Sequence, residues 1–114
     1  MHMKPLHIET PFFESRALTI GAGRTVWIKL EAMQPPGSFK IRGIGLACQE
    51  YVRRGAERFI SSSSGNAGIA VAYAGRHLSV PVVVVRPARC RRHWRQDSLY
   101  GWVLAARRQR MARS

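Results

Sequence analysis

The feature that most constrains the fold is the stretch at residues 80–85, Val-Pro-Val-Val-Val-Val, an almost unbroken run of β-branched side chains. A run without alternating polar residues is typical of a strand that is covered on both faces, as strands in parallel sheets are. Parallel neighbours must be joined by crossover segments, usually helices, so the preceding residues should alternate between strand and helix. The run therefore favours an α/β fold, with a parallel sheet and covering helices.

The residues before this run show the expected alternation. Two strand patterns lie at residues 25–30 and 58–61, the first with its apolar side chains on one face. Apolar residues at helical spacing predict a helix over about residues 39–54, which Gly55 should end. Small residues, mostly Ala and Gly, predict a second helix over residues 67–77 that can pack closely on a sheet. We therefore expect parallel strands joined by two helices.

The N-terminal part of the chain is less regular. Residues 6–11 are expected to form an extended entry segment, because Pro11 keeps Thr10 out of the helical region. A short turn of helix is predicted over residues 12–18, and Gly-Ala-Gly at 21–23 is predicted to be a loop. These segments should lead directly into the first strand.

A single lysine stands at the predicted start of the first helix. Gln-Pro-Pro-Gly at residues 34–37 forms a turn, Ser38 offers an N-cap oxygen, and Lys40 follows. Free N–H groups and the positive end of the helix dipole make this an unfavourable place for an ammonium group. The position suits an amine that is uncharged and bound covalently to an aldehyde cofactor. The alternative is that Lys40 is a solvated surface lysine.

A serine-rich loop precedes the second helix. Residues 61–68 read Ser-Ser-Ser-Ser-Gly-Asn-Ala-Gly, which puts Ser64, Gly65 and Asn66 at the helix entrance. Backbone N–H groups are free there, so the loop is suited to bind a carboxylate or a phosphate. The alternative is an ordinary capped helix after a serine-rich linker. The loop is not a Walker phosphate loop, because no Gly-Lys-Ser/Thr follows.

These two motifs together point to a family. Ser-Phe-Lys-Ile-Arg-Gly at residues 38–43 resembles the pyridoxal-phosphate lysine motif of the serine/threonine dehydratases, which belong to the tryptophan-synthase-β-like (fold type II) enzymes. Ser-Ser-Gly-Asn-Ala-Gly at 63–68 is similar to their substrate-carboxylate loop, and the spacing between the two motifs also fits. Gln-Pro-Pro-Gly-Ser at 34–38 suggests the L-serine dehydratase branch. The resemblance covers about residues 4–85.

The resemblance implies a role for each matching residue. Lys40 would hold pyridoxal 5'-phosphate through a Schiff base and then remove the substrate α-proton, in a desolvated site that keeps its amine neutral. Phe39 would pack on the cofactor ring, and Asn66 would hydrogen-bond the ring hydroxyl. The substrate carboxylate would be bound by the loop residues Ser63, Ser64, Gly65, Asn66 and Ala67. The implied L-serine ammonia-lyase reaction converts serine to pyruvate and ammonia; the alternative is threonine ammonia-lyase or another β-elimination or replacement.

The chain falls into two parts of different composition. Residues 1–85 hold ten Lys or Arg and five Glu, and we interpret them as a truncated pyridoxal-phosphate-enzyme domain. Residues 86–114 hold nine Arg and one Asp, and there the resemblance stops. We interpret this arginine-rich tail as non-native, through a frame shift, or as disordered. The phosphate loop and the pyridine-nitrogen partner of the family would lie beyond residue 114, so we expect one half of a site, inactive alone.

Composition and charge argue against several other classes of protein and leave one open. With 46% hydrophobic residues, the chain has no apolar run near the roughly 20 residues of a membrane span, and no signal peptide is expected. Cys48 and Cys90 form no paired motif, so we expect no metal site and a reducing, cytoplasmic setting. The net charge of +13 leaves open a non-catalytic, nucleic-acid-binding role or an inert product, although basic runs are more often solvated. The expected partners are a small amino-acid substrate and, for full-length relatives, a second copy.

Overall fold

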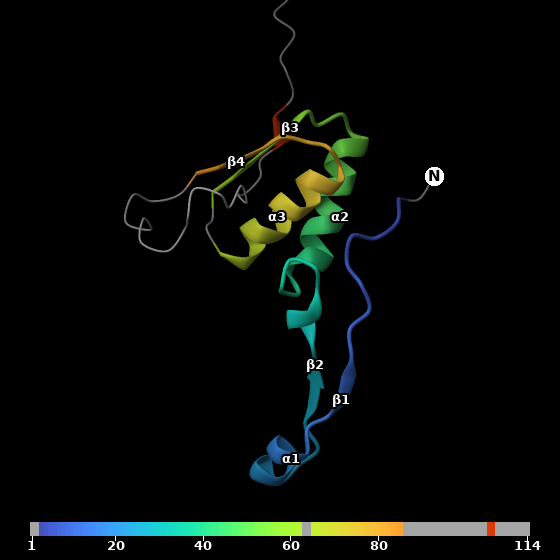
Figure 1. Ribbon diagram of the computed structural model, residues 1–114, viewed down its shortest axis with the longest axis vertical. Coiled ribbons are helices and arrows are strands. Elements are labelled where there is room, and N and C mark those ends of the chain that lie inside the picture. Colours follow the sequence, from blue (N-terminus) through green and yellow to red (C-terminus); the bar gives the residue numbers. More distant parts are fainter. Residues whose placement is uncertain (1–2, 63–64, 86–104, 107–114) are drawn as a thin grey trace, which may run out of the picture.

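The computed structural model describes residues 3–62, 65–85 and 105–106. In chain order its elements are β1 (Phe12–Glu14), α1 (Arg16–Ala22), β2 (Trp27–Lys29), the 3-10 helix η1 (Glu31–Met33), α2 (Lys40–Arg53), β3 (Arg58–Ser61), α3 (Asn66–His77), β4 (Val82–Val84) and β5 (Ala105–Ala106). Figure 1 shows two parts: an arm made of β1, α1 and β2, and a body made of α2, α3 and the other three strands. No helix in the described part is long and apolar enough to span a membrane.

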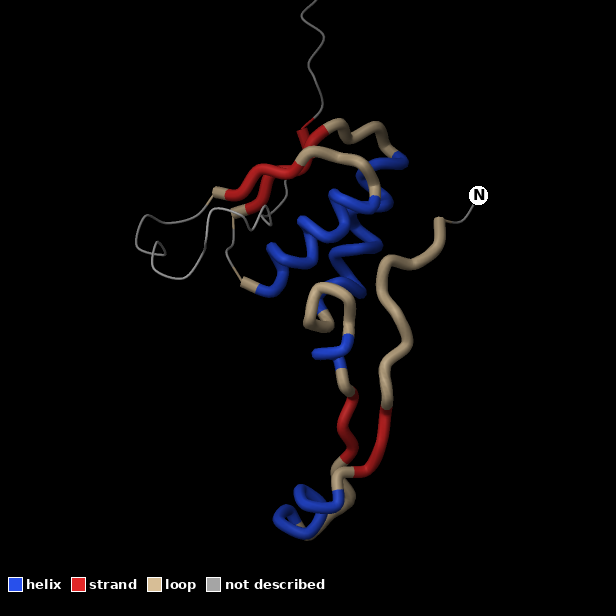
Figure 2. The backbone as a smooth tube through the Cα atoms, viewed as in Figure 1, coloured by secondary structure: helices blue, strands red, loops and turns tan. Residues whose placement is uncertain are grey.

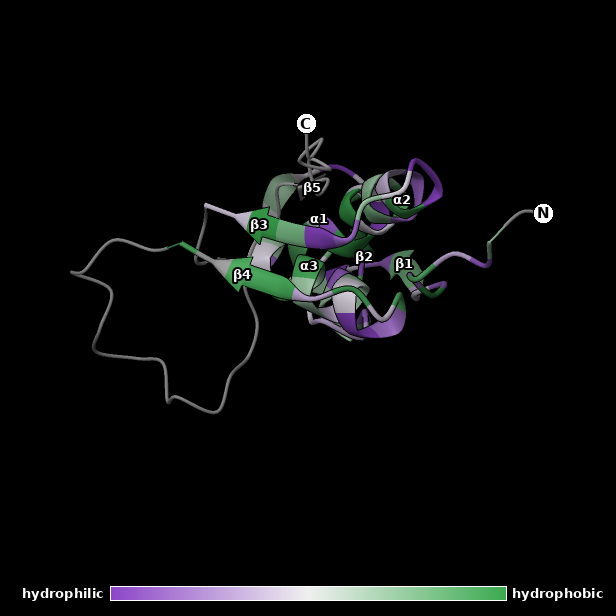
Figure 3. Cartoon of the chain, turned by 90° about the horizontal axis from the view of Figure 1, so that it is seen from above, coloured by the Kyte–Doolittle hydropathy of each residue, from purple (hydrophilic) through white to green (hydrophobic). Residues whose placement is uncertain are grey.

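The body contains the α/β arrangement that the sequence predicts. Its sheet has the strand order β4-β3-β5, and α3 is the crossover that joins β3 to β4. β3 and β4 are parallel, with Phe59 opposite Val82, whereas β5 is antiparallel to β3. Figure 3 shows the hydrophobic residues of β3 and β4 side by side. The parallel pair and its helical crossover confirm the predicted α/β fold.

The valine run differs from the prediction in one respect. β4 covers Val82–Val84 of the run, and the side chains of Val83 and Val85 are 44% and 57% exposed. In Figure 1 both α2 and α3 lie below the β3–β4 pair. Within the described residues one face of β4 is therefore open to solvent, although the sequence predicted cover on both faces.

The core lies between the two long helices and the sheet. Its most buried members come from both helices and from β3: Cys48, Phe59, Val71 and Ala74. The small residues of α3 allow it to approach the sheet closely. A Cβ atom at Gly75 would clash with the Val82 side chain and would lie 2.9 Å from the carbonyl oxygen of Val80.

The arm is built on main-chain pairing. β1 and β2 are antiparallel, with Phe13 opposite Ile28. α1 is capped at its start by Ser15, whose side chain accepts a hydrogen bond from the Leu18 N–H, and it ends at Gly23 with a φ of 65°. Glycine suits that end because a left-handed φ carries no Cβ penalty there.

The predicted elements of the arm need two corrections. Residues 12–14, predicted as helix, form the strand β1, and α1 continues as far as Ala22 through part of the predicted loop at 21–23. The strand predicted at 25–30 is present as β2, but it pairs with β1 and not with the parallel sheet. A local pattern identifies a strand without fixing its partner, and the three residues of β1 are too few to show alternation.

Figure 2 shows the entry segment, predicted as extended over residues 6–11, as a loop that bends at Leu6 and His7 and leads into β1. It forms no regular helix or strand between residues 3 and 11. Side chains hold its backbone instead. The Nε2 of Gln49, in α2, donates to the Lys4 carbonyl oxygen at 2.7 Å. The segment is therefore fastened to the body despite its lack of regular structure.

Candidate functional site

Lys40 is the first residue of α2, close to where the sequence predicts a helix start. Its side chain is exposed, and within the part of the chain that the structure describes its amine makes no hydrogen bond or ion pair. The amine lies 4.9 Å from the centre of the Phe39 ring, which is 58% exposed. Lys29 provides the contrast, because its amine donates to the Thr10 carbonyl oxygen at 2.6 Å. Of these two lysines, Lys40 has the amine that is available for reaction.

A turn fixes the start of α2. Gly37 adopts a φ of 81°, and its N–H donates to the Gln34 carbonyl oxygen at 2.7 Å. Phe39, which precedes α2, already has helical dihedral angles and makes no side-chain cap bond; the capping oxygen comes from Ser38, as predicted. The Ser38 hydroxyl accepts a hydrogen bond from the Lys40 N–H at 3.4 Å.

The desolvated surroundings expected for Lys40 are not provided by the described residues. Lys40 and Phe39 are both exposed, whereas the adjacent Ile41 is fully buried. The first turn of α2 thus has a packed face, which carries Ile41, and an open face, which carries the amine. Any further burial of the amine must come from outside the described residues.

The start of α3 is the second motif. Gly65 is its N-cap residue, and its carbonyl oxygen accepts from the N–H groups of Gly68 and Ile69 at 3.0 and 3.2 Å. The N–H groups of Asn66 and Ala67 have no acceptor among the described residues, as expected in the first turn of a helix. Asn66 is exposed and Ala67 is buried. The chemistry of this helix start is that of an anion site.

The structure brings the two motifs to the same end of the body. α2 and α3 pack against each other, and both begin at the lower end of the body in Figure 1. Lys40 and the free N–H groups of α3 therefore share that end. Ser63 and Ser64, the other residues of the predicted carboxylate loop, lie outside the described residues, as does the predicted tail at 86–114 apart from β5.

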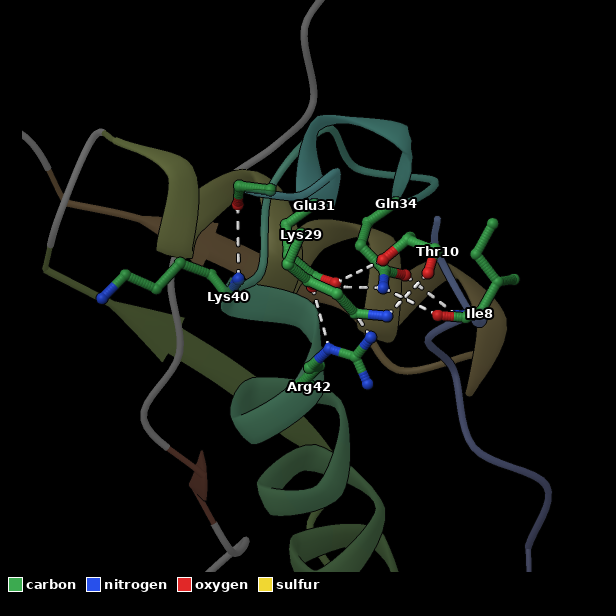
Figure 4. Close-up of polar contacts among 8 residues, drawn as sticks. Ile8, Thr10, Lys29, Glu31, Gln34, Lys40 and Arg42 are labelled. Atoms are coloured by element: carbon green, nitrogen blue, oxygen red, sulfur yellow. Dashed lines mark hydrogen bonds and ion pairs between the residues drawn. The ribbon is translucent and has the colours of Figure 1, made fainter. Parts of the chain in front are cut away.

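Figure 4 shows a polar network at the start of α2 that was not predicted from the sequence. At its centre the Glu31 carboxylate accepts two hydrogen bonds from the Arg42 guanidinium, at 2.8 and 2.9 Å. These bonds are the main reason why the pKa of Glu31 is lowered to about 2, so the carboxylate is ionised at neutral pH. Gln34 also belongs to the network, although the sequence suggested only a turn there. Glu31 and Arg42 are 11 residues apart and lie on either side of the Gln-Pro-Pro-Gly turn, so no single helical or strand pattern pairs them.

The fold is that of the tryptophan-synthase-β-like (fold type II) pyridoxal-phosphate enzymes. The crystal structure of an L-serine ammonia-lyase from the fungus Rhizomucor miehei aligns with a TM-score of 0.65 and 38% identity, over 74% of this chain and 27% of that one. A pyridoxal 5'-phosphate-dependent aspartate racemase aligns with a TM-score of 0.63 and 33% identity, over 73% and 29%. Both similarities confirm the predicted fold class.

Sequence comparison gives the family. The family model described as "Pyridoxal-phosphate dependent enzyme" matches residues 3–112, and the chain belongs to this family. The L-serine dehydratase/L-threonine deaminase of Bos taurus is 51% identical over 88 residues, which make up 77% of this chain and 27% of the relative. The chain thus spans about a quarter of the length of the curated relatives that it matches. The predicted family is confirmed, while the predicted boundary between residues 85 and 86 stays a prediction.

Proposed function

We propose that this chain provides the lysine-bearing part of a pyridoxal-phosphate-dependent ammonia-lyase that converts serine, or threonine, to a keto acid and ammonia. The observation that carries the proposal is the exposed amine of Lys40 at the first turn of α2, which makes no hydrogen bond or ion pair within the described residues. It lies at the same end of the body as the first-turn N–H groups of α3. The names of the Bos taurus relative, an L-serine dehydratase/L-threonine deaminase, and of the fungal L-serine ammonia-lyase support this substrate class.

The residues at these two helix starts fit pyridoxal 5'-phosphate by their chemistry. Lys40 offers the cofactor aldehyde an amine that makes no hydrogen bond or ion pair in the described part of the chain and contacts the Phe39 ring. Phe39 offers an exposed ring, 4.9 Å from that amine, on which a flat heterocycle can pack. Asn66, exposed at the start of α3, would hydrogen-bond the ring hydroxyl. When bound, the cofactor supplies an electron sink for the substrate carbanion.

In this proposal Lys40 also takes the α-proton of the substrate. A base must be uncharged when it accepts a proton. Covering the open face of Lys40 and Phe39 would exclude water from around the amine.

The start of α3 would bind the substrate carboxylate. The N–H groups of Asn66 and Ala67, which have no acceptor among the described residues, and the positive end of the helix both attract an anion. Gly65 leaves the approach open, because a Cβ atom there would meet nothing within 4 Å. Ser63 and Ser64 are assigned to the same loop on the strength of the family motif.

The cofactor proposal is tested by trapping. The full chain is mixed with pyridoxal 5'-phosphate, reduced with borohydride, digested, and its peptides are weighed by mass spectrometry. The chain has three lysines, Lys4, Lys29 and Lys40, so the labelled site is read without ambiguity. We expect the label on Lys40, its loss in Lys40→Ala, and its retention in Lys29→Ala, the matched control. Equal labelling of all three lysines would overturn the proposal.

The carboxylate site is tested by competition. Serine added before reduction should compete for the cofactor and lower the label on Lys40. Serinamide keeps the amine and the hydroxyl but lacks the carboxylate, so it should compete far less if the α3 start binds that group. Equal competition by the two compounds would show that the start of α3 does not bind the carboxylate.

A further inference from the structure

A network of hydrogen bonds joins four segments at the start of α2: the entry segment, η1, the turn that follows η1, and α2 itself (Figure 4). The Glu31 carboxylate, in η1, accepts from the Arg42 guanidinium of α2 at 2.8 and 2.9 Å. It also accepts from Thr10 Oγ1, in the entry segment, at 2.6 Å, and from Gln34 Nε2, in the following turn, at 3.2 Å. These four residues, Thr10, Glu31, Gln34 and Arg42, are called the clasp below.

Gln34 ties the clasp to the entry segment a second time. Gln34 is buried, with only 2% of its surface exposed. Its Oε1 accepts from the Ile8 N–H at 2.9 Å, and its Nε2 donates to the Ile8 carbonyl oxygen at 2.8 Å. One amide thus satisfies both backbone groups of residue 8, as a neighbouring strand would. The entry segment is held against the start of α2 at two points, residues 8 and 10.

The clasp reaches Lys40 through the backbone. Arg42 lies two residues after Lys40, and its own N–H donates to the Phe39 carbonyl oxygen at 3.0 Å. Its side chain therefore anchors the turn on which the lysine stands. In Figure 4 the Lys40 side chain extends away from the clasp. The clasp can set the position of the amine without touching it.

The other end of α2 carries a matched but different cluster. Glu50 accepts from Arg53 at 2.7 Å and from Arg54 at 2.6 Å, and these bonds likewise lower its pKa to about 2. All three residues belong to α2 or to its C-cap. Its side chains are also more exposed: 36% for Glu50, against 16% for Glu31. Glu50 therefore serves as a control for the loss of a charge from α2 and its flanks.

We propose that the clasp is a positioning device for Lys40: Glu31, with Gln34 and Arg42, fixes the first turn of α2 against the entry segment and so holds the lysine amine where the cofactor aldehyde is met. The inference rests on the proposed function, because the position of the Lys40 amine matters only if that amine binds the cofactor. Glu31, Gln34 and Arg42 are positioning residues, since none of them contacts the amine in Figure 4.

The test compares Glu31→Gln with Glu50→Gln in the full chain. The first readout is the rate of borohydride trapping of pyridoxal 5'-phosphate on Lys40, measured where circular dichroism shows each variant to be folded. Glu31→Gln should slow trapping by about tenfold or more, because a small misplacement of a reacting group is costly, whereas Glu50→Gln should stay within about twofold of the parent chain. Arg42→Lys, which keeps the charge, should be slowed less than Arg42→Gln.

Two further readouts separate positioning from other effects. The pH midpoint of trapping should be the same in Glu31→Gln as in the parent chain, because the clasp acts on position and not on the charge of the amine. Hydrogen exchange of the backbone amides at residues 40–43 should rise by about tenfold in Glu31→Gln and should not rise in Glu50→Gln.

The outcomes distinguish the two proposals. If the parent chain does not label Lys40 selectively, the proposed function fails, and hydrogen exchange still decides whether the clasp orders the start of α2. The positioning role is overturned if Glu31→Gln traps and exchanges like Glu50→Gln. It is also overturned if the pH midpoint moves, since Glu31 would then act through its charge.

Discussion

The arm and the body are stabilised by different interactions. In the body, α3 buries seven of its 12 residues against α2 and the sheet. In the arm, α1 buries none and β1 is exposed throughout, although Phe12, Ile20 and Trp27 are large and apolar. The body is held by packing, whereas the arm is held by strand pairing, a cap and one stacked aromatic pair. Substitutions of the same kind should therefore have very different effects in the two parts.

The largest difference is expected for phenylalanine. Phe59, in β3, is fully buried, so Phe59→Ala should lower the free energy of unfolding by about 3–5 kcal/mol. Phe12, in β1, is 62% exposed and stacks on Trp27 with ring centres 5.2 Å apart, so Phe12→Ala should cost about 1 kcal/mol or less. Urea unfolding followed by circular dichroism measures both. Equal losses would mean that the arm has a core of its own.

Glycine to alanine should change stability in opposite directions in the two parts. Gly75→Ala puts a methyl group into the Val82 side chain and should cost about 1–3 kcal/mol through overpacking. Gly21→Ala, in α1, meets nothing within 4 Å, and alanine favours the helix by up to about 1 kcal/mol. Thermal melting of the two variants gives the signs. If Gly75→Ala raised the melting temperature, α3 would not be packed closely against β4 at this position.

Burial in the body also raises the pKa of one side chain, the Cys48 thiol. Desolvation raises the pKa of the Cys48 thiol from 9.0 to about 11. The unfolded chain loses this proton first, so the free energy of unfolding should be unchanged below the unfolded-state pKa and fall by about 2 kcal/mol or less as the pH rises from 9 to 11. Cys48→Ala should lack this part of the alkaline loss. If the parent chain and Cys48→Ala lost the same stability between pH 9 and 11, the Cys48 thiol would not have the raised pKa that its burial predicts.

The smallest effect is expected at the cap of the arm. Ser15→Ala removes the oxygen that accepts from the Leu18 N–H, which should cost α1 about 1 kcal/mol. The loss should raise hydrogen exchange in α1 and leave the urea midpoint of the body unchanged, because α1 buries no residue. Ser15→Asp, which keeps a capping oxygen, is the control. A shift of the body's midpoint would show that arm and body unfold as one unit.

The elements of the body could be predicted from the sequence more fully than those of the arm. The strand at 58–61, the helix from 66 and the parallel strand after it were predictable, because small and β-branched residues mark a helix packed on a sheet. β1 was not, because Phe12–Glu14 is short and its partner β2 lies beyond α1. A pairing between separated segments leaves no periodic signal in either one.

The candidate site divides in a similar way. Lys40 and the Gly65–Asn66 helix start could be identified because each is part of a contiguous motif. The clasp could not, because Gln34 bonds a residue 26 positions away and Glu31 one that is 21 positions away. The exposure of Lys40 was also unpredictable, since it depends on what surrounds the first turn of α2 and not on the motif itself.

The bond between Gln34 and residue 8 has a consequence for how freely the start of the chain can vary. The glutamine recognises main-chain atoms alone, and the Ile8 side chain is 46% exposed. Most amino acids are thus interchangeable at that position without disturbing the attachment. Proline is the exception, as it has no N–H to give, and a related chain with proline there would have to fasten its leading segment by another route.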